Sequence, residues 1–373
     1  MALRNDTLAG GSYRGLFERL HLDLPLLLGL LVLCGCGLAV LFSASDQSTG
    51  QVGRQLIRFA LALAIMVMVA QIHPDQLRRW SLPLFILGVV MLVAVEIMGD
   101  IGKGAQRWLD LGIFRFQPSE LLKLAVPMML AWIFSGAVLP PSLPRILLAV
   151  IITTVPVLLI ARQPDLGTAL MVTSAAVVVL FMAGLSWRLI GLLAALAAGA
   201  APVLWYMMHD YQRQRVLTFL DPQSDPLGSG YHIIQSQIAI GSGGMYGKGW
   251  FRGTQSHLEF LPERSTDFIF AVLGEEFGLV GILGVLLVYL FIIFRGLYIA
   301  ARAPNSYSRL LGGAIIMVFF TYLFVNTGMV VGLLPVVGVP LPLISYGGTS
   351  LVTIMAGFGI LMSIHTSRYS QSR

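Results

Sequence analysis

Long apolar runs alternate with short polar segments along almost the whole chain. The runs are continuous, as from Ile57 to Val69, and do not alternate every second residue as the strands of a membrane barrel would. A helix needs about 20 largely apolar residues to cross a bilayer. The pattern therefore predicts an all-α polytopic membrane protein with about ten transmembrane helices, over residues 24–43, 55–72, 81–98, 119–135, 145–161, 167–183, 188–208, 267–294, 310–334 and 343–364.

The composition agrees with this prediction and narrows the function. Of 373 residues, 57% are hydrophobic and 11% are charged, whereas a soluble domain carries about 25% charged residues. The mean hydropathy is +0.82. These values exclude a disordered chain, a nucleic-acid-binding domain and an ordinary cytosolic enzyme. The net charge of +6 does not by itself indicate a polyanionic partner, because Lys and Arg also orient membrane helices. We expect no nucleic acid partner.

The distribution of Lys and Arg gives the expected orientation. With the N-terminus in the cytoplasm, twelve of the 24 basic residues fall on each side, and discounting those in the longest loop favours this orientation. We expect one membrane domain, residues 1–373, with an uncleaved first helix and both termini in the cytoplasm. Its parts are a cytoplasmic N-terminal segment 1–23, a large extracytoplasmic loop 209–266 between the seventh and eighth helices, and a cytoplasmic tail 366–373.

Two outer segments are more than simple turns. Residues 99–118 are amphipathic and rich in glycine and aromatic residues, which suits the membrane interface. Within the long loop, His232 to Ile240 is expected to form a short interfacial helix. Cys34 and Cys36 both lie in the first apolar run at positions i and i+2, so they point to different sides of a helix and cannot form a disulfide.

A few charged residues lie at the ends of apolar runs, and each has a structural and a functional interpretation. Glu120 and Lys123 share one helical face, where they form either a structural ion pair or the charged mouth of a cavity. Asp165 is either a helix N-cap, with Arg162 as a local ion pair, or a site residue. Asp267 is either an acid of the first helical turn or a catalytic acid or base, and Ser265 and Thr266 already offer hydroxyls for the cap.

Two acidic residues further along the same run need a separate interpretation. Glu275 and Glu276 are adjacent, so they point about 100° apart and cannot both line one site. We expect one of them to pair with an arginine. Three outer histidines, His209, His232 and His257, lack the spacing of a zinc site.

Four motifs resemble those of the SEDS family (shape, elongation, division and sporulation). They are GAQRWLDLGIFRFQPSELLKL, QPDLGTAL, LPERSTDFIFAVLGEEFG and NTGMVVGLLPVVGVPLPLISYGGTS, and together they extend over most of the chain. The short termini and the second motif resemble the elongation branch, which determines rod shape, more than the division branch. Ser265 departs from the pattern, because many relatives have His at that position.

The resemblance implies a peptidoglycan glycosyltransferase that polymerises lipid II on the outer face of the bacterial cytoplasmic membrane during elongation. It also implies a class B penicillin-binding protein, a transpeptidase, as partner, together with other membrane proteins of the elongation complex. The essential Asp of the family motif corresponds to Asp267. The other sensitive positions of the family correspond to Arg107, Trp108, Glu120, Lys123 and Asp165.

The reaction that the resemblance implies assigns chemical roles to these side chains. One inverting displacement joins the 4-hydroxyl of one disaccharide to the anomeric carbon of another and releases undecaprenyl pyrophosphate, which requires one general base. Asp267 is the candidate. The departing pyrophosphate requires positive charge, for which Arg107, Lys123, Arg213 and Arg215 are candidates. No cofactor is certain, and a divalent cation, Mg²⁺ or Mn²⁺, could supply the same charge.

Two other functions fit a helix bundle. A lipid II flippase would place charges along a path through the membrane, whereas the charges of this chain gather toward one face. A non-catalytic scaffold would not explain Glu120, Lys123 and Asp267 near that face. The polymerase is therefore favoured, and the flippase is the main alternative.

Overall fold

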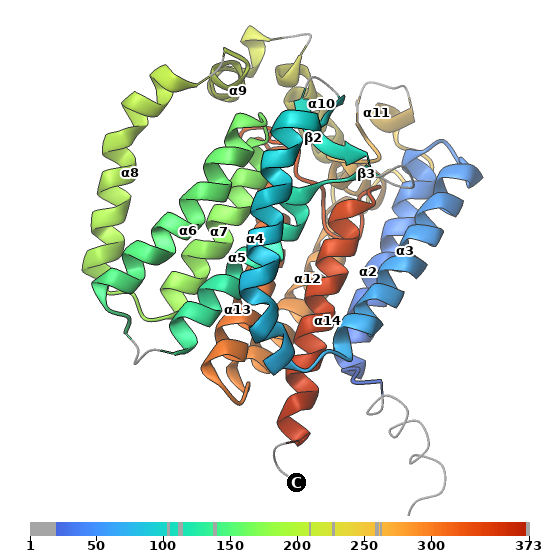
Figure 1. Ribbon diagram of the computed structural model, residues 1–373. Coiled ribbons are helices and arrows are strands. Elements are labelled where there is room, and N and C mark those ends of the chain that lie inside the picture. Colours follow the sequence, from blue (N-terminus) through green and yellow to red (C-terminus); the bar gives the residue numbers. More distant parts are fainter. Residues whose placement is uncertain are drawn as a thin grey trace, which may run out of the picture.

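The structure is a bundle of long helices with a small sheet and short helices gathered at one end (Figure 1). It is a computed structural model that describes residues 20–102, 105–110, 115–136, 140–208, 210–225, 228–257, 261 and 263–370. The long helices are α2 (Leu24–Ala44), α3 (Thr49–Ala70), α4 (Pro74–Met98), α5 (Pro118–Ser135), α6 (Leu143–Arg162), α7 (Leu166–Met182), α8 (Trp187–Met207), α12 (Ile269–Ala301), α13 (Ser306–Val330) and α14 (Thr349–Ser370).

Each of the ten apolar ranges expected to span the membrane overlaps one of these helices. Seven helices of the described part are long and apolar enough to cross a membrane. Their outward faces remain apolar, and Ile57 and Ile97 are 71% and 75% exposed. In water such faces would be costly, so they indicate contact with lipid. The helical, multi-pass fold is confirmed, while the number of spans stays a prediction.

The clearest departure from an all-helical fold lies between α4 and α5. This segment forms β1 (Asp100–Gly102), β2 (Ala105–Asp110) and β3 (Arg115–Phe116), paired antiparallel in the order β1-β2-β3. The expected aromatic character is present, but the glycines disfavour a helix and aromatic residues such as Trp108 and Phe116 favour strands. A sheet pairs its own backbone groups, which suits a segment at the border of the membrane.

The long outer loop is also largely structured. It contains α9 (Asp210–Leu220), the 3-10 helix η1 (Pro222–Ser224), α10 (Ser229–Gly243) and α11 (Thr254–His257). The helix expected over 232–240 is confirmed and extends further in both directions. At the opposite end, α14 continues to Ser370, so most of the predicted tail 366–373 is helical.

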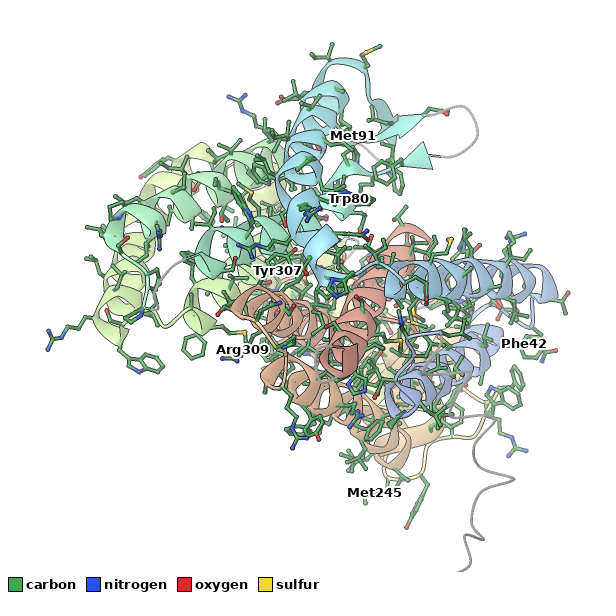
Figure 2. The ribbon with its side chains drawn as sticks, turned by 60° about the horizontal axis from the view of Figure 1, so that its bottom comes forward. Phe42, Trp80, Met91, Met245, Tyr307 and Arg309 are labelled. Atoms are coloured by element: carbon green, nitrogen blue, oxygen red, sulfur yellow. The ribbon has the colours of Figure 1, made fainter. Side chains whose placement is uncertain are left out.

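Tyr307 and Arg309 lie close together in the sequence of α13, but one is buried and the other is exposed (Figure 2). Tyr307 lies between α13 and α4, where its hydroxyl is 3.0 Å from the Ser81 hydroxyl. Arg309, two residues along α13, is exposed at the rim. The C-terminus and Arg309 share this end, which the sequence predicts to be cytoplasmic.

A break in α12 fixes the glycine-rich part of the outer loop. At Gly278 the backbone has φ +65, a left-handed conformation that favours glycine. The Lys248 and Gly249 N–H groups donate to the carbonyls of Glu275 and Glu276, both at 3.0 Å. The loop between α10 and α11 therefore supplies the hydrogen bonds that the break would otherwise leave unmade.

Glu275 fastens the same loop with its side chain. Its carboxylate is fully buried and accepts hydrogen bonds from Lys248 Nζ at 2.8 Å, from the Thr254 N–H at 2.7 Å and from the Gln255 N–H at 2.9 Å. Lys248 of the folded-back loop is thus a cationic partner of Glu275, and the pairing of one of the two glutamates with an arginine stays a prediction. Burial without such partners would cost several kcal/mol.

The apolar stretch between α13 and α14 is irregular rather than helical. Residues 331–348 form turns and extended segments, so α14 begins six residues later than the predicted start at residue 343. Pro335, Pro340 and Pro342 lack the N–H that a helix requires, and Gly332 and Gly338 have positive φ. The stretch thus places irregular backbone beside the outer ends of α12 and α13.

We predict opposite effects of the same substitution at two glycines of α10. At Gly243 a Cβ would overlap the carbonyl oxygen of Gly274 in α12, whereas at Gly241 it would meet no atom within 4 Å. Gly243→Ala should destabilise the protein by about 1–3 kcal/mol. Gly241→Ala should be neutral or stabilise it by up to about 1 kcal/mol. Thermal unfolding in detergent measures both, and equal melting temperatures of the two variants would contradict this packing.

Candidate active site

Asp267 lies in a turn immediately before α12. The turn is closed by the Thr266 and Phe268 N–H groups, which both donate to the Glu263 carbonyl. Phe268 occupies the N-cap position, and no side chain caps this helix. The carboxylate of Asp267 is half-buried. The alternative that Asp267 is an acid of the first helical turn is therefore wrong, because the residue precedes the N-cap and the first turn of α12 contains no acid.

Three consecutive carbonyls hold this turn in place. The Ser265 carbonyl accepts from the Tyr346 N–H at 2.8 Å, and the Thr266 carbonyl accepts from the Ser345 hydroxyl at 2.6 Å. The Asp267 carbonyl accepts from Asn326 Nδ2 at 2.9 Å. Because each of these bonds goes to a backbone carbonyl, the bonds fix the position of the main chain that carries the Asp267 carboxylate.

Asn326 connects the turn to the irregular stretch. It is fully buried on α13, and its Nδ2 also donates to the Val339 carbonyl at 2.8 Å. The neighbouring Gly338 has φ +72, and a Cβ there would lie 3.5 Å from Asp267 Oδ2. Glycine therefore leaves space directly beside the carboxylate.

Asp165 caps α7 close to the same stretch. Its Oδ1 accepts from the Thr168 N–H at 3.2 Å and its Oδ2 from Gln117 Nε2 at 3.0 Å. Two residues later, a Cβ at Gly167 would lie 2.7 Å from the Val337 carbonyl oxygen, so α7 packs tightly on residues 337–339. The N-cap interpretation of Asp165 is confirmed.

Arg107 approaches Asp165 from β2. Its Nε lies 3.9 Å from Asp165 Oδ2 and donates to the Gln163 carbonyl at 3.2 Å, and its Nη2 donates to the Pro164 carbonyl. The predicted partner, Arg162, instead lies 3.9 Å from Glu96. That prediction was wrong, because the sheet brings Arg107 to Asp165 and Arg162 faces α4.

Glu120 and Lys123 form a buried ion pair on α5. Lys123 Nζ donates to Glu120 Oε1 at 2.7 Å and to the Tyr322 hydroxyl at 2.5 Å. Each residue is only 5% exposed. Tyr322 precedes Asn326 by four residues on α13, so the two share one face about 6 Å apart along the axis. The pair therefore lies one helical turn deeper than the Asp267 turn.

The remaining sequence-predicted residues lie at the border of this site or away from it. Trp108 is half-buried on β2, where its partner in the register is Asp100. Arg213 of α9 donates to the carbonyls of Trp205 and Tyr206 at 2.9 and 2.7 Å. Figure 1 shows α9 near the upper end of α8, which stands at the edge of the bundle. Arg215 lies half-buried on the same short helix.

Sequence reasoning missed three residues of this site. Asn326, Gln117 and Tyr322 each hold a charged or catalytic candidate in place, yet none is ionised at neutral pH. A signal was available for Asn326, which is the single amide side chain in the run 310–334. A buried amide needs partners, so its presence in an apolar run indicates a polar contact across the bundle.

The described residues contain no group of three or more His, Cys, Asp or Glu side chains that could hold a metal ion. Asp267 alone could provide one ligand. Mg²⁺ often binds through one or two carboxylates and the phosphates of a substrate, so a divalent cation stays a prediction.

Comparisons with known proteins agree over nearly the whole chain. The family model of the cell cycle proteins FtsW, RodA and SpoVE matches residues 19–370. The Escherichia coli strain K12 protein named peptidoglycan glycosyltransferase MrdB is 56% identical over 358 residues, which cover 96% of this chain and 97% of that protein.

Solved structures of other proteins are also similar to this chain. A chain of a peptidoglycan synthase complex, described by its coordination of polymerization and crosslinking, has a TM-score of 0.81 at 34% identity, with 93% of this chain and 98% of that chain covered. The rod shape determining protein RodA of Thermus thermophilus has a TM-score of 0.71 at 29% identity, with 93% and 97% covered.

We predict that the Glu120–Lys123 pair tolerates joint replacement better than single replacement. Lys123→Met leaves the Glu120 charge buried, which should cost about 3–5 kcal/mol. Glu120→Leu combined with Lys123→Met removes both charges and should recover most of that loss. Thermal unfolding of the three proteins in detergent tests this. A single variant as stable as the double variant would show that the two charges are not coupled.

Proposed function

This chain belongs to the FtsW, RodA and SpoVE family of cell cycle proteins, and from that membership we propose that it is a peptidoglycan glycosyltransferase that polymerises lipid II into glycan strands. The observation that carries the proposal is 56% identity to peptidoglycan glycosyltransferase MrdB over 96% of the chain. The likeness to a rod shape determining protein supports a role in elongation and rod-shape maintenance.

Asp267 is the general base of the reaction. The 4-hydroxyl oxygen of the acceptor sugar forms a bond to the anomeric carbon of the donor, and the bond from that carbon to the diphosphate oxygen breaks. The hydroxyl proton passes to the Asp267 carboxylate. Three features support this role, namely the half-buried carboxylate, the backbone bonds that fix its turn, and the open space beside Gly338.

The other polar residues orient this base or bind substrate. Asp165 and Gln117 hold the start of α7 against residues 337–339, which lie next to the carboxylate of Asp267. The Glu120–Lys123 pair fixes α5 to α13 one turn below Asn326, which makes it a positioning pair. Arg107, whose side chain is 31% exposed, keeps donors available for substrate, and Trp108, Arg213 and Arg215 offer further contacts at the edge of the outer face.

The location follows from the helices and from the substrate. The chain is a multi-pass protein of the bacterial cytoplasmic membrane, with its termini in the cytoplasm and Asp267 on the extracytoplasmic face. A polyprenyl tail can then stay in lipid while the sugars reach the turn before α12. A class B penicillin-binding protein, a transpeptidase, is the expected partner, supported by the similar chain in a peptidoglycan synthase complex, and other elongation-complex proteins would join it.

A lipid II flippase remains the alternative. The fold gives it less support, because a transport path needs polar groups at successive depths. In the described residues, the candidate polar groups around Asp267, Asp165 and Asn326 gather at one end of the bundle, and Glu120 and Lys123 neutralise each other.

We predict that Asp267→Asn abolishes polymerisation while leaving the fold intact. The amide keeps the shape and the backbone bonds of the turn but cannot accept the proton, so the rate should fall by at least about 100-fold. Purified protein with its transpeptidase partner is given lipid II, and the glycan product is separated on a gel. Asp221→Asn, an exposed outer acid, is the matched control and should polymerise normally.

Two outcomes would contradict this proposal. Normal polymer from Asp267→Asn would remove its role as base. If the wild type makes no polymer with its partner, but moves lipid II across the bilayer of vesicles, the protein is a flippase.

We predict the membrane orientation from two exposed aromatic residues at opposite ends. Tyr246 lies in the outer loop and Trp187 at the start of α8, with 83% and 77% of their surfaces exposed. In a background with Cys34→Ala and Cys36→Ala, a membrane-impermeant maleimide should label Tyr246→Cys in intact spheroplasts. It should label Trp187→Cys only after permeabilisation. The reverse pattern would invert the orientation.

A further inference from the structure

Two arginines of α3 converge on one tyrosine at the outer end of the bundle. Arg54 and Arg58 are four residues apart and so share one helical face. Arg54 Nε donates to the Tyr346 hydroxyl at 3.3 Å, and the Arg58 guanidinium carbon lies 4.4 Å from the centre of the Tyr346 ring. The tyrosine belongs to the irregular stretch between α13 and α14.

Neither arginine has an anionic partner among the residues that the structure describes. Within the described part of the chain, no carboxylate forms an ion pair with Arg54 or Arg58, whereas Arg264 at the same end pairs with Asp46. The other ion pairs of the described residues involve different cations. Like charges one turn apart on a helix repel each other by about 0.2–0.5 kcal/mol. An anionic ligand bound between the two guanidinium groups would relieve this repulsion.

The arginine pair is attached to the turn that carries Asp267. The Tyr346 N–H donates to the Ser265 carbonyl, two residues before Asp267. Gln55, next to Arg54, is buried, and its Nε2 donates to the Ser345 carbonyl at 3.4 Å. A Cβ at Gly348 would lie 3.6 Å from Arg58 Nε, so glycine leaves one side of that guanidinium uncovered by a side chain.

The cations that the sequence suggested for a diphosphate have other partners. Lys123 is buried between Glu120 and Tyr322. Arg213 donates to the end of α8, and Arg107 donates to the carbonyls before Asp165. Arg54 is exposed and Arg58 half-buried, so both can meet a ligand that arrives at the surface of the bundle.

Resting on the proposed function, we propose that Arg54, Arg58 and Tyr346 bind the diphosphate of the polyprenyl-linked substrate. A guanidinium can donate two parallel hydrogen bonds to phosphate oxygens, and two guanidinium groups match a diphosphate. As the bond from the anomeric carbon to the diphosphate oxygen breaks, its electron pair stays on that oxygen. The arginines stabilise the charge that develops there, opposite the proton transfer to Asp267.

Tyr346 contributes more than a surface for the guanidinium groups. Burial raises the pKa of its phenol, but the hydrogen bond from Arg54 and the positive charges of Arg58 and Arg54 outweigh burial and lower this pKa. The phenol stays protonated at neutral pH and becomes a better hydrogen-bond donor. It can therefore donate to a phosphate oxygen while it accepts from Arg54.

The test measures binding separately from turnover. In the Asp267→Asn background, which cannot polymerise, native mass spectrometry in detergent compares binding of undecaprenyl diphosphate, undecaprenyl monophosphate and phosphatidylglycerol. Adding Arg54→Gln and Arg58→Gln together should weaken diphosphate binding at least 10-fold and the other two lipids less than 3-fold. Arg54→Lys with Arg58→Lys keeps the charge but loses the paired donors, and should retain part of the affinity.

The control removes one positive charge elsewhere on the outer face. Arg162→Gln, with a side chain that is 76% exposed, should leave diphosphate binding unchanged, and all variants should melt within a few degrees of the parent. Diphosphate binding by the Gln variant equal to that of the Arg162→Gln control overturns the proposal. Equal weakening for all three lipids assigns the arginines to general headgroup contact and also overturns it.

Turnover then separates this proposal from the proposed function. In the otherwise unchanged protein, Arg54→Gln with Arg58→Gln should lower polymerisation at least 10-fold. A wild type that binds the diphosphate through the arginines but makes no polymer would contradict the glycosyltransferase and leave the binding site in place.

Discussion

The arrangement of the outer end depends on hydrogen bonds to three consecutive carbonyls. Ser265, Thr266 and Asp267 present these carbonyls to donors from residues 345 and 346 and from Asn326. At the border of a membrane, backbone groups that are not paired within the protein are costly, so the turn has few alternative conformations. The backbone of Asp267 thereby gains a fixed position at the outer end of the bundle.

The same constraint explains the glycine-rich loop and the break in α12. A helix that is interrupted at Gly278 needs donors and acceptors from elsewhere, and residues 244–249 provide them. The carboxylate of Glu275 adds a second attachment to the loop, with Lys248 as its counter-ion. The outer loop is therefore part of the helix bundle's hydrogen-bonding system, and α10 is packed directly beside the start of the helix that follows Asp267.

Local sequence patterns were sufficient for the helices and for some of the polar contacts. Continuous apolar runs located all ten long helices, because burial in lipid requires length and hydropathy that are visible in the sequence. The Glu120–Lys123 pair and the Asp165 cap were predictable because their partners lie within three residues. Contacts between segments distant in the sequence were not predictable. Arg107 meets Asp165 only after the strands pair, and Tyr322 contacts Lys123 although nearly 200 residues separate them. Residues 331–348 were as apolar as a span, and only their prolines and glycines indicated irregular backbone.

The cost of desolvating charge also determines where chemistry can occur in this fold. Inside the bundle a cation is tolerated only with a partner, as Lys123 is with Glu120, and such a pair has little charge left to offer a substrate. Arginines without an anion can persist only where water reaches them, and Arg54 is exposed at the outer end. A reaction that needs both a carboxylate and uncompensated positive charge is therefore restricted to the end of the bundle where the Asp267 turn and the arginines of α3 are joined through Tyr346.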